Sequence, residues 1–79
     1  MRFRNGREAK IGDVFRLGDG TKGTVVCSID GAQYSESYPE AQWSYLGQGI
    51  LAETESMGLV HYEEPEANMV FEHGAEENT

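Results

Sequence analysis

The pattern of apolar and polar residues predicts five short β-strands. Apolar and polar positions alternate along residues 11–17 and 49–55, and residues 23–29 are dense in β-branched side chains. Both features are typical of strands. Residues 59–63 are expected to pair with 49–55 as a hairpin, and the short apolar stretch 68–72 to supply the last strand. Because glycine-containing turns separate most of these stretches, the sequence predicts an all-β fold, a small five-stranded barrel.

The predicted hairpin divides its side chains between two faces. Successive side chains of a strand point to opposite sides of a sheet. Ile50, Ala52 and Thr54 therefore share one face, which we expect to face the core, while Glu53 and Glu55 share the other.

The segment between the second and third predicted strands, residues 32–48, has no clear period. The sequence Ser37-Tyr38-Pro39-Glu40 fits a capping box, which favours a helical turn that runs through Trp43 and ends at Gly47. An irregular loop that carries aromatic side chains is the alternative. We therefore expect either a short helical turn or an irregular aromatic loop around residues 37–46.

The length of 79 residues allows a single domain. We place this domain at residues 1–72, with a basic arm or irregular strand at 1–10 and a flexible acidic tail at 73–79. A domain of this size has a thin core, so a homo-oligomer stays open as a way of burying more surface.

The first predicted hairpin resembles that of SH3-like barrels of the KOW and Tudor kind. The stretch begins Lys10-Ile11-Gly12-Asp13-Val14-Phe15-Arg16-Leu17 and continues, after Gly20, with Gly23-Thr24-Val25-Val26. In those families a Gly-Asp precedes the first strand and a Gly-x-Val begins the second. The resemblance covers roughly a quarter of the chain and implies a superfold rather than a function.

The second hairpin is similar to the final hairpin of the plasmid-type (type II) dihydrofolate reductases, which are SH3-like barrels of comparable length. That family carries a Val-Gln-Ile-Tyr motif on the strand that lines a basic pore. This chain has Leu59-Val60-His61-Tyr62, so only the tyrosine matches, and no basic residue lies nearby. We therefore expect a shared superfold and no enzyme activity.

Positive and negative charges are segregated along the chain. All six basic residues lie within residues 1–22, which carry a net charge of +3, whereas residues 23–79 carry eleven carboxylates and no basic residue. The net charge of the whole chain is −8. This segregation favours a basic partner. It argues against direct binding of nucleic acid or of an anionic membrane, because both need clustered basic side chains.

The residues that most often carry chemistry are few. Cys27 is the only cysteine, so no internal disulfide is expected, and its place in an apolar strand predicts an inert thiol. His61 and His73 do not have the spacing of metal ligands. We expect no catalytic residue, metal or cofactor. No apolar run has the length of a signal peptide or a membrane span, so a soluble cytoplasmic protein is expected.

Four aromatic residues gather in the irregular segment: Tyr34, Tyr38, Trp43 and Tyr45. Tyrosine and tryptophan combine an apolar body with a polar tip and are frequent anchors of protein interfaces. Two interpretations stay open, because the same side chains are also suited to covering an open end of the barrel.

The preferred functional hypothesis is a protein-interaction module that binds a basic protein partner. In this hypothesis the aromatic residues are the anchors and carboxylates steer the partner; the carboxylates are Glu53, Glu55, Glu63, Glu64 and Glu66. Two alternatives belong to other classes. One is a decoy that imitates the charge of nucleic acid and inhibits a DNA- or RNA-binding protein. The other is a structural protein that assembles through its basic start and acidic remainder.

Overall fold

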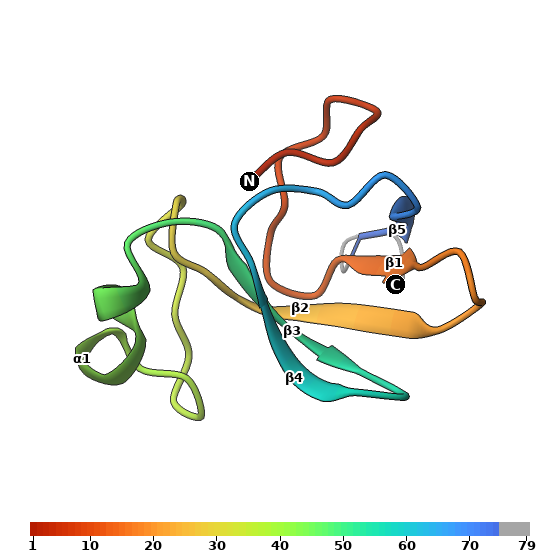
Figure 1. The fold of residues 1–79 in the computed structure, drawn as a ribbon. Helices are drawn as coiled ribbons and strands as arrows, with labels where there is room; N and C mark the ends of the chain where they lie inside the picture. The colour runs from red at the N-terminus through yellow and green to blue at the C-terminus, as the bar shows by residue number, and fades with distance from the viewer. Residues whose placement is uncertain (75–79) are drawn as a thin grey trace.

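Five antiparallel strands form one sheet in the computed structural model, which describes residues 1–74 (Figure 1). The strands are β1 (Val14–Arg16), β2 (Lys22–Ser28), β3 (Ile50–Thr54), β4 (Gly58–Tyr62) and β5 (Val70–His73). Their order in the sheet is β4-β3-β2-β1-β5, so the last strand returns to pair with the first. Each strand overlaps one predicted stretch, and the predicted all-β fold class is confirmed.

The main core lies on the face of the sheet that the alternation predicts. Ile50, Ala52 and Thr54 of β3 are all buried, which confirms the face assigned to the hairpin. Ile50 and Ala52 belong to the main hydrophobic cluster, whose other buried members are Met1, Phe3, Ala9, Phe15, Val25, Tyr62 and Met69. The ring of Phe15 meets that of Tyr62 edge to face, with centroids 6.0 Å apart, a favoured aromatic geometry.

A β-bulge in β2 turns the end of that strand toward the other face of the sheet. Val25 pairs with Ala52 and Cys27 with Leu51, so Val26 is the extra residue between them. Without it, Val25 and Cys27 would point to the same face. Because of the bulge, Val25 enters the main core while Cys27 joins Leu51 in a second cluster on the outer face.

The N-terminal residues pack against the sheet. Met1 and Phe3 are buried in the main core. Arg7 reaches back to the buried carboxylate of Asp13, with Nε–Oδ2 and Nη2–Oδ1 distances of 3.2 and 3.0 Å. The backbone N–H of Lys10 also donates to Asp13, at 3.0 Å. Charge-assisted bonds of this kind offset the cost of burying a carboxylate.

The segment between β2 and β3 contains the predicted helical turn. It consists of α1 (Glu40–Trp43) followed by a 3-10 turn at Ser44–Leu46. Gly47, at a φ of 82°, ends it, as expected. The predicted capping box is wrong, because Pro39 is the N-cap and no side chain caps the helix. Pro39 has extended backbone angles, as an N-cap residue does, so the helix begins at Glu40.

Most of the predicted tail lies outside the described residues. Of residues 73–79, the structure describes His73, which ends β5, and Gly74. Within residues 1–74, the helices are all too short to cross a membrane.

Candidate functional site

The aromatic segment (residues 29–49) folds over the outer face of the sheet. Tyr34, Tyr38 and Trp43 are each half-buried and pack against a second hydrophobic cluster that includes Cys27 and Leu51. The rings of Tyr38 and Trp43 lie 6.4 Å apart between centroids. Three of the four aromatic residues predicted as anchors therefore cover apolar residues of β2 and β3.

The fourth aromatic residue is placed differently. Tyr45 is 75% exposed and lies outside the cluster formed by the other three. The indole N–H of Trp43 is buried and has no hydrogen-bond acceptor within the described part of the chain. A buried donor without an acceptor costs about 1–3 kcal/mol, so this N–H weakens the packing of the aromatic segment.

The environment of the aromatic segment also affects ionisation. Burial raises the pKa of Tyr34, and the nearby Cys27 and Glu40 add to this effect. Burial likewise raises the pKa of the Cys27 thiol. Both groups are therefore held in their neutral forms, and Cys27 is poorly suited to act as a nucleophile.

The β3–β4 hairpin carries an exposed surface on which acidic and apolar side chains adjoin. Glu53 is exposed and pairs directly across the strands with Leu59, itself 41% exposed. Glu55 is exposed just beyond the end of β3, where its carboxylate accepts a 2.9 Å hydrogen bond from the backbone N–H of Lys22. Met57, in the turn, is 55% exposed. We call these four residues the hairpin surface: Glu53, Glu55, Met57 and Leu59.

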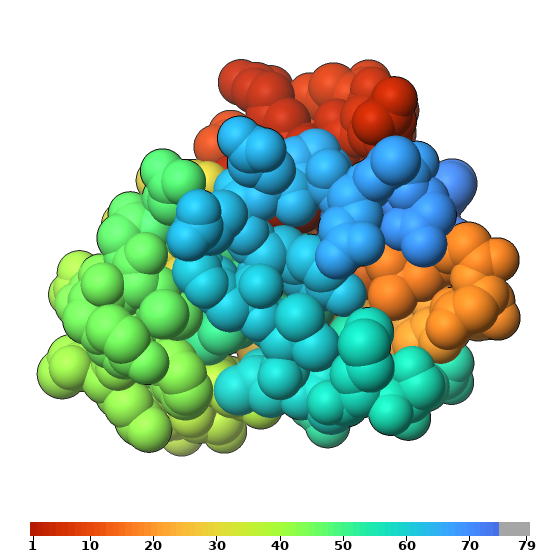
Figure 2. All heavy atoms as spheres, viewed as in Figure 1, coloured from red at the N-terminus to blue at the C-terminus, as the bar shows by residue number. Residues whose placement is uncertain are grey.

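Two hydrogen bonds connect the aromatic segment to β4 and its following residue. His61 Nε2 lies 2.8 Å from the carbonyl oxygen of Gln48, and the Gln48 side-chain amide donates to Glu63 at 3.4 Å. Glu63 therefore lies beside the aromatic segment. Figure 2 shows this segment, in green, next to the hairpin, in teal, along one side of the molecule.

The remaining two predicted carboxylates lie in the connection from β4 to β5. Glu64 and Glu66 are both exposed. Burial raises the pKa of Tyr62, and the charges of Glu66 and Asp19 raise it further. Glu66 therefore lies near Tyr62, whose side chain belongs to the main core.

None of the five predicted carboxylates forms an ion pair within residues 1–74. The ion pairs found there join Arg7 to Asp13, Arg16 to Glu72, and the N-terminal ammonium to Asp30. The carboxylates of the hairpin surface are thus available to a cation from outside the described chain. No group of three metal-binding side chains occurs among these residues.

Sequence reasoning missed two features of this region. It did not single out Met57 and Leu59 as exposed apolar residues, although the alternation places Leu59 on the same face as Glu53. The ion pair between Arg7 and Asp13 was also not predicted from the sequence. No local signal connects Arg7 with Asp13, because the bond depends on how the N-terminal turn packs.

Compared with known proteins, the chain matches no family model, no curated protein and no solved structure.

Proposed function

We propose that this chain is a small protein-interaction module that binds a basic protein through the hairpin surface. The observation that carries the proposal is the joint exposure of carboxylates without ion pairs and of large apolar side chains on one hairpin. Exposed apolar groups rimmed by polar ones are typical of interaction sites. We also propose that the fold is an SH3-like barrel. The pairing of β5 with β1 supports this part of the proposal.

The carboxylates have an electrostatic role in this proposal. Glu53 and Glu55 are exposed, so each contributes little to affinity by itself. Their charge instead raises the rate at which a basic partner meets this face, and it rejects acidic competitors. The net charge of −8 acts in the same direction.

The apolar side chains supply the contact. Leu59 lies directly across the strands from Glu53 and can be covered by a partner, as can Met57 at the turn. Methionine adapts its shape to irregular surfaces. Tyr45, exposed in the neighbouring aromatic segment, is the further anchor. Tyr34, Tyr38 and Trp43 are already packed over Leu51 and Cys27 on the outer face of the sheet, so they are less accessible to a partner than Tyr45.

The test compares matched variants of the full chain. Proteins captured from the host lysate by the wild-type chain are identified by mass, and the most enriched basic protein is purified for kinetic measurements. We expect Glu53→Gln to slow its association about two- to fivefold and to flatten the salt dependence. Glu8→Gln removes the same charge from an exposed site on the N-terminal turn and should leave the rate unchanged. Leu59→Thr should speed dissociation.

Other results would contradict the proposal. Equal effects of Glu53→Gln and Glu8→Gln would mean that net charge alone governs binding. If the captured protein binds nucleic acid, and that nucleic acid competes with this chain for one basic site, the result would instead favour the decoy hypothesis. Capture of the chain by itself, weakened by salt, would favour self-assembly.

A further inference from the structure

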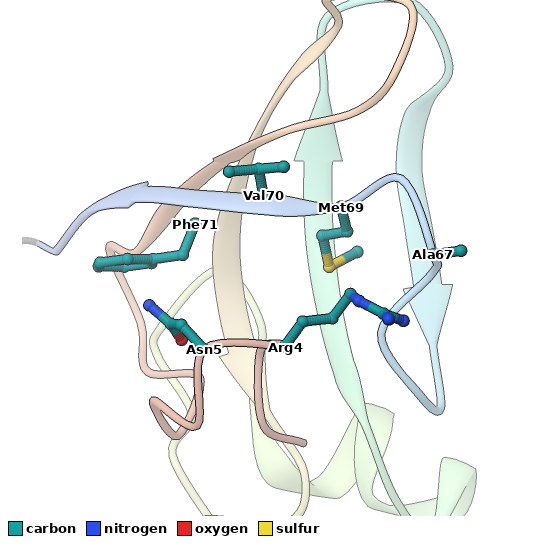
Figure 3. A pocket seen from close by; sticks show the side chains of 6 residues that line it. All are labelled: Arg4, Asn5, Ala67, Met69, Val70 and Phe71. Atoms are coloured by element: carbon teal, nitrogen blue, oxygen red, sulfur yellow. The ribbon is translucent and has the colours of Figure 1, made fainter.

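A cleft of about 360 Å³ lies on the opposite side of the fold from the aromatic segment, between the N-terminal turn and β5. Arg4 and Asn5 line one side of it. Met69 and Phe71 line the other, and Figure 3 shows their side chains pointing toward Arg4 and Asn5 across the cleft. Ligand sites in proteins commonly have volumes of about 300–1,000 Å³, so the cleft has the size of a small-molecule site.

The apolar side of the cleft is held firmly in place. Met69 is almost completely buried in the main core. The ring of Phe71 packs against Phe3, with centroids 5.3 Å apart, and the guanidinium carbon of Arg7 lies 4.6 Å from its centre. A ligand would therefore meet a preformed apolar surface, and little ordering of the protein would oppose binding.

The polar side of the cleft presents donors without partners. The guanidinium of Arg4 is exposed and makes no ion pair or hydrogen bond within residues 1–74. The Asn5 side-chain oxygen accepts a 3.0 Å bond from the N–H of Arg7, which leaves the NH₂ group of the same amide to donate. A guanidinium fork matches a carboxylate, which accepts two parallel hydrogen bonds from it.

We propose that this cleft binds a small monocarboxylic acid whose body is apolar. The carboxylate pairs with the Arg4 guanidinium, while the apolar body extends along the cleft toward Phe71 and Asn5. The local charge supports this class of ligand, because Arg4 makes no ion pair within residues 1–74 and belongs to residues 1–22, whose net charge is +3. The proposal is independent of the hairpin surface, which lies on other strands.

The probe is octanoate, titrated below its micelle concentration into the ¹⁵N-labelled full chain and followed by amide chemical shifts. Octan-1-ol has the same apolar length without the charge and serves as the matched ligand. We expect octanoate to give saturable shifts at Arg4, Asn5 and Phe71, and octan-1-ol to bind at least threefold more weakly.

Three variants test the cleft itself. Arg4→Gln should weaken octanoate binding about three- to tenfold. Asn5→Asp keeps an acceptor for the Arg7 N–H but adds a negative charge, and should weaken binding at least as much. Lys10→Gln removes an exposed cation that does not line the cleft, and should change the affinity less than twofold.

Several outcomes would overturn the proposal: equal affinities for octanoate and octan-1-ol, equal effects of Arg4→Gln and Lys10→Gln, or shifts centred elsewhere. Binding of a peptide with an apolar C-terminal residue, lost when its carboxylate is amidated, combined with no binding of octanoate, would identify the cleft as a peptide site and would also refute it.

Discussion

Gly49 connects the aromatic segment to β3. Its replacement by alanine tests how closely this residue packs against the backbone at the end of β4. The residue has a φ of 93°. A Cβ added there would lie 2.1 Å from the carbonyl oxygen of Tyr62 and 2.8 Å from the Cα of Glu63. Both atoms belong to the backbone at the end of β4, so no side-chain rotation can relieve the contact.

Two costs combine in Gly49→Ala. A positive φ costs a residue with a Cβ about 1–2 kcal/mol. Relief of the clash requires β4 to move away from β3 where Ile50 pairs with Tyr62, and overpacking of this kind costs about 1–3 kcal/mol or more. The sum is about 2–5 kcal/mol, while a domain of 79 residues has a total stability of about 4–12 kcal/mol. The variant should therefore lie close to the limit of folding.

Gly58→Ala is the matched control. Gly58 also has a positive φ, of 72°, but a Cβ there would meet nothing within 4 Å. This variant should lose only the free energy that a positive φ costs a residue with a Cβ, about 1–2 kcal/mol. Urea unfolding followed by far-ultraviolet circular dichroism measures both. With a slope of about 1 kcal/mol per molar, Gly58→Ala should lower the midpoint by about 1–2 M and Gly49→Ala by about 2–5 M.

Equal losses of stability in the two variants would refute the reasoning. That result would mean that the close approach between Gly49 and Tyr62 is absent in solution, and that the aromatic segment enters β3 by another path.

The other predictions concern single side chains. Asp13→Asn should reduce the free energy of unfolding by about 3 kcal/mol, because it removes the buried charge that accepts hydrogen bonds from the Arg7 guanidinium and the Lys10 N–H; a loss below 1 kcal/mol in urea unfolding would contradict this. Trp43→Ala should cost about 2 kcal/mol, whereas Trp43→Phe should cost less than about 1 kcal/mol, because it also removes the unpaired indole N–H. Equal losses by circular dichroism would mean that this N–H finds an acceptor. Cys27 is buried with a raised pKa, so it should react with a thiol reagent only as fast as the protein unfolds; rapid reaction of the native protein would show that the aromatic segment opens. Hydrogen bonds from the backbone N–H and the side-chain hydroxyl of Thr21 lower the pKa of Asp19. Its contribution to stability is therefore complete above a pH of about 4 and lost as the pH falls below it, and Asp19→Asn should show a smaller acid loss than the wild type.

The strands were predictable because the pattern that marks them is local. The alternation along residues 49–55 assigns Ile50 and Ala52 to one face of the sheet, and the pairing of β3 with β4 keeps that assignment. The helical turn near Trp43 was left open between two interpretations, because four helical residues are too few to show a period.

The rest depends on contacts between distant residues. Leu51 lies on the face that the alternation assigns to solvent, yet it is buried because the aromatic segment covers it. Met1 belongs to the core because the N-terminal turn folds over the sheet. Neither fact follows from the neighbouring sequence. For the candidate site, the sequence correctly indicated exposed carboxylates on the hairpin, but the division of the aromatic residues into three that cover the sheet and one that is exposed required the structure.

The bulge at Val26 allows one strand to serve two independent hydrophobic clusters. Val25 belongs to the first and Cys27 to the second, and the two clusters lie on opposite faces of the same sheet. The segment that covers the second cluster can therefore change in length and composition while the first cluster keeps its packing, provided that Gly49 is kept and Leu51 stays covered. An insertion at this point alters one surface of the protein without rebuilding its core, so the fold carries a natural position for acquiring new binding surfaces.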